Sequence, residues 1–140
     1  MPRVSAAREL LASRDDVWQF IAEPRHFADW WPGINAVQPE RRGLAEGARW
    51  HVITGDRPTL LRRSTSSGML LVRAVRVPEL FGFTLTGDHI DGELRLDARD
   101  DDRTLAVLEL EAPWMFGISR ALPRRALTRL HSLCQTAAEL

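Results

Sequence analysis

The chain has 140 residues, 44% hydrophobic and 27% charged, and its 19 basic and 19 acidic residues give a formal net charge of zero. This length and composition predict one globular domain spanning residues 1–140. The neutral balance argues against nucleic-acid binding, because such proteins need a clustered positive excess.

The residue types that the chain lacks exclude further functions. Every basic residue is an arginine, so no lysine can form a Schiff base or complete a phosphate-binding loop. Cys134 is the only cysteine, which rules out an internal disulfide. The start MPRVSAAREL lacks the apolar run of a signal peptide, and no later stretch reaches 18 apolar residues. We therefore expect a cytoplasmic protein without a membrane span.

The N-terminal part predicts one strand and two short helices. The strand is expected at Arg3–Leu11. Ser13 precedes Asp16 by three residues, the spacing of a capping box, and the apolar pattern that follows predicts a helix ending near Glu23. A second short helix is predicted over Pro24–Trp31, because it has proline at its start and Pro-Gly just after its end.

Two adjacent tryptophans, Trp30 and Trp31, close that second helix. Consecutive side chains point about 100° apart on a helix and to opposite faces on a strand. Both indoles therefore cannot lie in the same ordinary core layer. The pair predicts either that one indole is exposed or that both line a hollow.

From Ile34 to Ala112 the pattern changes to strands that alternate apolar and polar residues. The predicted strands are Ile34–Arg41, Ala48–Thr54, Met69–Val77, a run from Phe81 to Thr86, Glu93–Arg99 and Leu105–Ala112. The stretch DARDDDRT predicts a hairpin turn, and residues 56–68 are expected to form a loop. Strand alternation places Arg73 and Arg76 on opposite faces, so at least one of them is expected to point inward.

The C-terminal segment predicts one long amphipathic helix beginning at Pro123. A shorter helical lead-in is expected around Trp114–Arg120. The apolar side of the long helix consists of Ala126, Leu127, Leu130, Leu133, Cys134, Ala137 and Ala138. The whole order predicts an α+β fold, in which a curved antiparallel sheet of about seven strands wraps around the C-terminal helix, with two short helices after the first strand.

Four features stand in a distinctive order along the chain: ASRDDVWQFIAEPRHFADWWPGI, Gly47 before a strand, VRVPEL and DDRTLAVLELE. In this order they resemble the SRPBCC superfamily of START-like and Bet v 1-like proteins, and within it the polyketide cyclase/dehydrase-like branch. The resemblance implies a helix-grip fold with a deep cavity between the sheet and the long helix, and two short helices at the rim of its mouth. The superfamily hosts transport, binding and catalysis, so the resemblance leaves the function open.

The resemblance also implies which side chains line the cavity. The candidate ligand-binding residues are Trp30, Trp31, Trp50, Phe83, Trp114, Met115, Phe116, Leu127, Leu130, His131 and Cys134. Of the adjacent pair, Trp30 is expected to point inward. Plain core packing is the alternative for Trp31, for Trp50 and for residues 114–116, although in a hollow fold a cavity wall is also core.

His131 is the best candidate for acid–base chemistry, because it lies at the border of the apolar helix face and titrates near neutral pH. The alternative is an ordinary hydrogen bond at the edge of the helix. Cys134 is expected to act as a small apolar residue. The histidines show no zinc-type spacing, and strand alternation would scatter the acidic residues of GDHIDGE, so no metal or cofactor is expected.

The main functional hypothesis is therefore binding of a hydrophobic, aromatic or polyketide-like small molecule in an internal cavity, with no catalysis required. One alternative is a cyclase or dehydratase that uses His131 as acid or base, although the chain has no tyrosine to assist it. A further alternative is a protein-interaction module, which an exposed apolar patch would favour.

Overall fold

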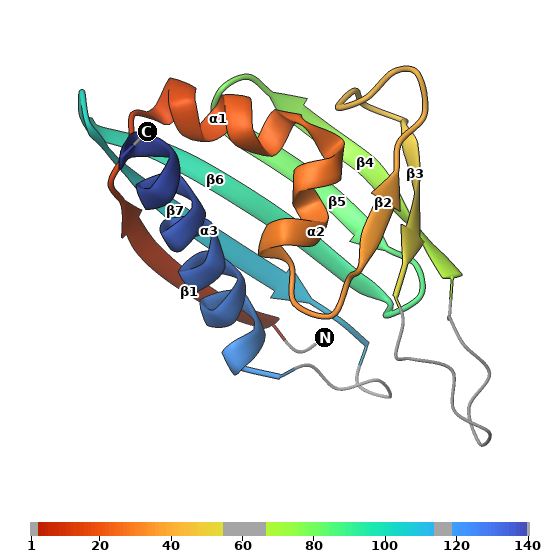
Figure 1. Ribbon diagram of the computed structural model, residues 1–140. Helices are drawn as coiled ribbons and strands as arrows, with labels where there is room; N and C mark the ends of the chain where they lie inside the picture. The colour runs from red at the N-terminus through yellow and green to blue at the C-terminus, as the bar shows by residue number, and fades with distance from the viewer. Residues whose placement is uncertain (1–2, 55–66, 114–118, 140) are drawn as a thin grey trace.

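The computed structural model describes residues 3–54, 67–113 and 119–139, which form a single sheet with helices on one side of it (Figure 1). The elements in chain order are β1 (Arg3–Leu10), α1 (Arg14–Ala22), the 3-10 turn η1 (Pro24–His26), α2 (Phe27–Trp30), β2 (Ala36–Gln38), β3 (Arg49–Ile53), β4 (Ser67–Arg76), β5 (Leu80–Leu85), β6 (Ile90–Asp100), β7 (Arg103–Glu111) and α3 (Ala121–Glu139).

In the described part of the chain the sheet has seven strands in the order β1-β7-β6-β5-β4-β3-β2, and every neighbouring pair is antiparallel. Helix α3 packs against β1, β7 and α2, while α1 and α2 lie over the middle of the sheet (Figure 1). This confirms the expected α+β helix-grip architecture. Below, the helix-covered side of the sheet is called the inner face and the opposite side the outer face.

The two short helices begin and end where their local sequence dictates. The Ser13 hydroxyl accepts a hydrogen bond from the backbone N–H of Asp16 at 3.1 Å, which caps α1 as the spacing predicted. Glu23 is extended and ends α1. The expected second helix begins as the 3-10 turn η1 and continues directly into a single turn of α2.

Arg73 corrects one expectation about the sheet. A bulge between Val72 and Ala74 inserts an extra residue into β4 and breaks the alternation. The Arg73 guanidinium lies on the outer face, where it donates to the carbonyls of Phe83 and Gly92 at 3.3 and 3.2 Å. Arg76 is exposed as well. The prediction that one of these arginines points inward was wrong, because strict alternation does not hold across a bulge.

Element ends differ from the predictions by a few residues. β2 covers only three residues of the predicted Ile34–Arg41, and Pro39, which has no N–H to donate, follows directly after it. The expected hairpin is confirmed, with its turn at residues 101–102. Most of the predicted 56–68 loop and of the 114–120 lead-in lies outside the described residues; Gly68 belongs to β4. No helix among the described residues is long and apolar enough to span a membrane.

Candidate ligand-binding site

Six buried aromatic rings gather on the inner face, over the middle of the sheet. We call them the aromatic cluster; its members, each at most 2% exposed, are Phe27, Trp30, Trp31, Trp50, Phe81 and Phe83. Three of the rings come from the segment Phe27 to Trp31 around α2. One ring comes from β3, and the other two project from β5. The cluster therefore joins α2 to the sheet beneath it.

Phe27 is the centre of the aromatic cluster, because its ring contacts all five other rings. It stacks on Trp31 with centroids 5.4 Å apart and planes at 14°. It meets the other four rings edge-on at centroid distances of 5.0 to 6.4 Å. These stacked and edge-to-face geometries are the favourable arrangements of aromatic quadrupoles.

The adjacent tryptophans are both buried, and the end of α2 explains how. Trp30 is the last helical residue, whereas Trp31 is extended with φ −91° and ψ 121°. Gly33, at φ 87°, then completes the reversal of the chain. Because the backbone changes conformation between the two residues, both indoles turn inward and meet edge-to-face at 5.9 Å. The expected conflict applied only to a continuous helix or strand.

Three polar side-chain atoms of described residues buried on the inner face differ in their hydrogen bonding. Trp50 Nε1 donates to the carbonyl of Gly43 at 2.9 Å. The hydroxyl of Thr104, the one fully buried polar residue among those described, donates to the carbonyl of Ala12 at 2.9 Å. Trp30 Nε1 is also buried, but it has no hydrogen-bond partner among the described residues. This N–H is the exception to the rule that buried polar groups are paired.

The other part of the inner face is lined by aliphatic side chains, and we call it the aliphatic half. It consists of the buried residues of β1, β7 and α3, namely Leu10, Ala106, Leu108, Leu110, Ala126, Leu127, Leu130 and Cys134. Helix α3 lies along β1 and β7 and places its apolar side on them. The helix amphipathicity predicted from sequence is thus used to close this half.

Two chemically reactive side chains lie on the inner side of α3. Burial raises the pKa of the Cys134 thiol to about 11, and the negative charge of Asp16 adds to the shift. The thiol is therefore protonated at neutral pH and acts as an apolar group. His131 is half-buried, and its imidazole forms no hydrogen bond or ion pair with another described residue. The described residues therefore supply no carboxylate to orient it.

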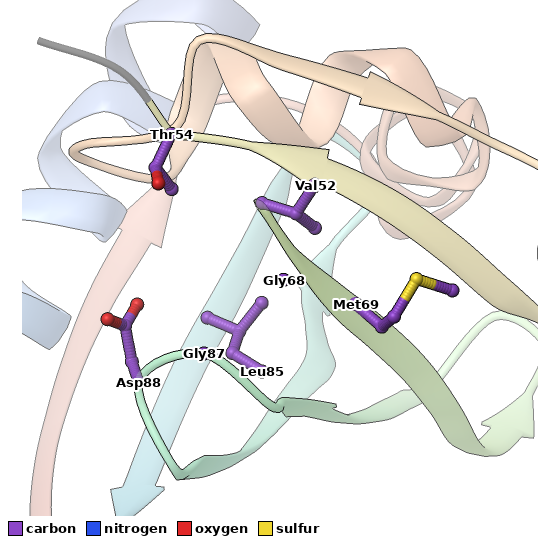
Figure 2. Close-up of a pocket in the computed structure, with 7 residues that line it drawn as sticks. All are labelled: Val52, Thr54, Gly68, Met69, Leu85, Gly87 and Asp88. Atoms are coloured by element: carbon purple, nitrogen blue, oxygen red, sulfur yellow. The ribbon is translucent and has the colours of Figure 1, made fainter. Parts of the chain in front are cut away.

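A small pocket opens at the rim of the sheet, next to the aromatic cluster (Figure 2). Its volume is about 20 Å³, which is room for about one water molecule. The lining residues are Val52, Thr54, Gly68, Met69, Leu85, Gly87 and Asp88. Figure 2 shows Thr54 and Asp88 on one side of this rim pocket and Met69 on the other.

The rim pocket adjoins the aromatic cluster through two strands. Val52 follows Trp50 by two residues on β3, and Leu85 follows Phe83 by two on β5. Residues two apart on a strand share a face, and all four of these side chains are buried on the inner face. The pocket is therefore the solvent-facing end of the same apolar surface.

The family described as "Polyketide cyclase / dehydrase and lipid transport" matches residues 1–132, nearly the whole chain. The protein belongs to this polyketide cyclase/dehydrase family. No curated protein sequence is significantly similar to it.

Several solved structures have the same fold as this member of the polyketide cyclase/dehydrase family. XoxI from Bacillus cereus is 13% identical, with 99% of each chain covered and a TM-score of 0.73. Norcoclaurine synthase from Thalictrum flavum, in complex with dopamine and hydroxybenzaldehyde, is 13% identical; 96% of this chain and 87% of that chain are covered, with a TM-score of 0.66. Ara h 8.0201 is 9% identical, with 96% and 98% coverage and a TM-score of 0.68. At these identities the likeness concerns the fold alone.

The structure brings most of the predicted site residues of this family member together on the inner face. Those that are buried there are Trp30, Trp31, Trp50, Phe83, Leu127, Leu130 and Cys134. They fall into two groups, with the rings in the aromatic cluster and the α3 residues in the aliphatic half. His131 is only half-buried, and Trp114, Met115 and Phe116 lie outside the described residues.

Sequence reasoning missed two members of the aromatic cluster, Phe27 and Phe81. Each carried a usable signal. Phe27 precedes Trp30 by three residues, so one turn of helix places both on the same side. Phe81 alternates with Phe83 on one strand and must share its face.

Proposed function

We propose that the protein binds a hydrophobic, aromatic small molecule on its inner face, at the aromatic cluster. The observation that carries this proposal is the concentration of six buried rings on one part of the inner face, beside a pocket that reaches solvent. Ligand sites are typically concave, mostly apolar surfaces with few polar groups. The rings would bind a planar ligand by the same stacked and edge-to-face contacts that they make with each other.

Membership of the polyketide cyclase/dehydrase and lipid-transport family supports a hydrophobic ligand. The likeness to norcoclaurine synthase, whose structure holds dopamine and hydroxybenzaldehyde, supports an aromatic one. In this proposal the rim pocket is the route by which a ligand reaches the cluster, because its floor continues the apolar surface of β3 and β5. Affinity would come mainly from apolar area removed from water, at about 25 cal/mol per Å².

The test is calorimetric titration with three probes: 2-ethylnaphthalene, decanoic acid and glucose. We expect the naphthalene to bind and glucose not to bind. The variant Phe83→Leu keeps an apolar side chain but removes a ring, and its affinity for 2-ethylnaphthalene should be about fivefold weaker. The control variant Val107→Leu changes a half-buried position on the outer face of β7 and should leave the affinity unchanged.

Two results would overturn this proposal. One is the absence of naphthalene binding to a folded wild-type protein. The other is an equal affinity in wild type and in Phe83→Leu. A preference for decanoic acid over the naphthalene would keep the apolar site but reject its aromatic selectivity.

A further inference from the structure

We infer that the ligand carries a neutral oxygen acceptor, a carbonyl or phenolic oxygen, and that Trp30 Nε1 donates a hydrogen bond to it. This inference rests on the proposed function and names the chemical class of the ligand. It starts from an asymmetry between two indoles. Trp50 Nε1 donates to the carbonyl of Gly43 at 2.9 Å, whereas Trp30 Nε1 has no partner among the described residues.

The unpaired N–H is unfavourable for the ligand-free fold. Trp30 is 0% exposed, so water on the surface cannot satisfy it. Leaving a buried donor unpaired costs free energy that a phenylalanine at the same place would avoid. Elsewhere the described fold pairs its buried side-chain polar atoms, as it does for Thr104. The Trp30 N–H is thus the one buried donor there that a bound molecule can still satisfy.

The chemistry of the indole restricts the partner. Indole Nε1–H donates and cannot accept, so the partner must be an acceptor and cannot be an ammonium group. The surroundings restrict it further. The rings nearest Trp30 are Phe27 at 5.0 Å and Trp31 at 5.9 Å, and no buried cation lies among the described residues. A carboxylate would be desolvated there without a counter-ion, which is strongly unfavourable. A neutral oxygen fits both restrictions.

The position of Trp30 also suits this role. Trp30 is held edge-on by both neighbouring rings, at interplanar angles of 78°. An aromatic ligand that packs on the cluster would therefore meet a donor in a fixed orientation. One such donor selects among apolar molecules of equal size, because a ligand without an acceptor leaves the N–H unpaired.

The test compares two probes that differ by the carbonyl oxygen, 2-acetylnaphthalene and 2-ethylnaphthalene. Wild type should bind the ketone about tenfold more tightly, although the ketone is the less hydrophobic of the two. Trp30→Phe should still bind the hydrocarbon with the affinity of wild type but should no longer prefer the ketone. Trp18→Phe makes the same change in α1, outside the aromatic cluster, and should retain the preference.

A second measurement uses wild type and does not depend on any variant folding. The Trp30 indole N–H resonance, assigned through its contacts with the rings of Phe27 and Trp31, should move downfield with the ketone and not with the hydrocarbon. If both probes bind wild type equally, the inference is overturned while the proposed function stands; the N–H then faces a ring or an internal water. If neither probe binds, the proposed function fails and this inference fails with it.

Discussion

The two parts of the inner face bury their apolar surface in different ways. In the aliphatic half, the long helix α3 covers β1 and β7 with leucines and alanines, and the buried hydroxyl of Thr104 at its end donates a hydrogen bond. In the aromatic cluster, one turn of helix holds interlocking rings beside a pocket, and one buried donor is unpaired. The difference teaches that one sheet can combine a region whose buried polar group is paired with a region that leaves a buried donor unpaired.

The largest expected effect is that of Phe27→Ala. Removing this ring breaks its contacts with the other five rings of the cluster, and large-to-small changes of buried aromatics cost about 3–5 kcal/mol of unfolding free energy. Urea denaturation followed by far-UV circular dichroism measures this loss. Affinity for 2-ethylnaphthalene should fall by at least about tenfold as well.

Leu108→Ala is the matched change in the aliphatic half. Leu108 is fully buried on β7, so its truncation should cost about 3 kcal/mol in the same denaturation experiment. The naphthalene affinity of the folded variant should equal that of wild type. A parallel loss of affinity in both variants would show that the two halves act as one site, and the distinction drawn above would be wrong.

The same contrast governs what the sequence could predict. Regular patterns gave the sheet, the capping of α1 by Ser13 and the apolar side of α3, because each depends on local spacing. The inward turn of Trp31 was not predictable from period alone, since it depends on where a one-turn helix ends. The side of the sheet on which Arg73 lies was not predictable for a similar reason, because a bulge depends on how β4 pairs with its neighbouring strand. The unpaired N–H of Trp30 is a property of packing, which no pattern encodes.

Gly92→Ala should destabilise the protein, because the added methyl group disturbs the packing of the aromatic cluster on the sheet. A Cβ at this position on β6 would lie 2.4 Å from the ring of Phe83, which is itself enclosed by its neighbours. Overpacking of this kind costs about 2 kcal/mol. Gly87→Ala is the control, because its Cβ would approach no closer than 3.7 Å to Gly68. Thermal unfolding should separate the two variants, and equal melting temperatures would contradict the tight packing of Phe83 on Gly92.

The smallest effect appears only at alkaline pH and reports on the aliphatic half. The Cys134 thiol has its pKa raised from 9.0 to about 11 in the fold, so the unfolded chain ionises first as pH rises. The folded protein should therefore lose about 2 kcal/mol of stability between pH 9 and pH 11, and almost none below about pH 8.

Cys134→Ala provides the reference for this loss. Because the chain contains neither lysine nor tyrosine, few other groups titrate in the same range. The difference in unfolding free energy between wild type and Cys134→Ala should shrink as pH rises through this interval. Parallel curves for the two proteins would mean that the thiol is accessible to water in the folded state.

The edge-to-face pair of Trp30 and Trp31 also gives the molecule an optical signature. Two indoles with centroids 5.9 Å apart and planes at 78° couple their electronic transitions, and a coupled pair adds an exciton couplet to the circular dichroism spectrum that separated indoles lack. Since the chain has no tyrosine, its intrinsic fluorescence comes from tryptophan alone, and three of its five tryptophans belong to the aromatic cluster. The tryptophans thus report on the candidate site without any label, because a ligand bound there should change their fluorescence emission and the ellipticity of the protein.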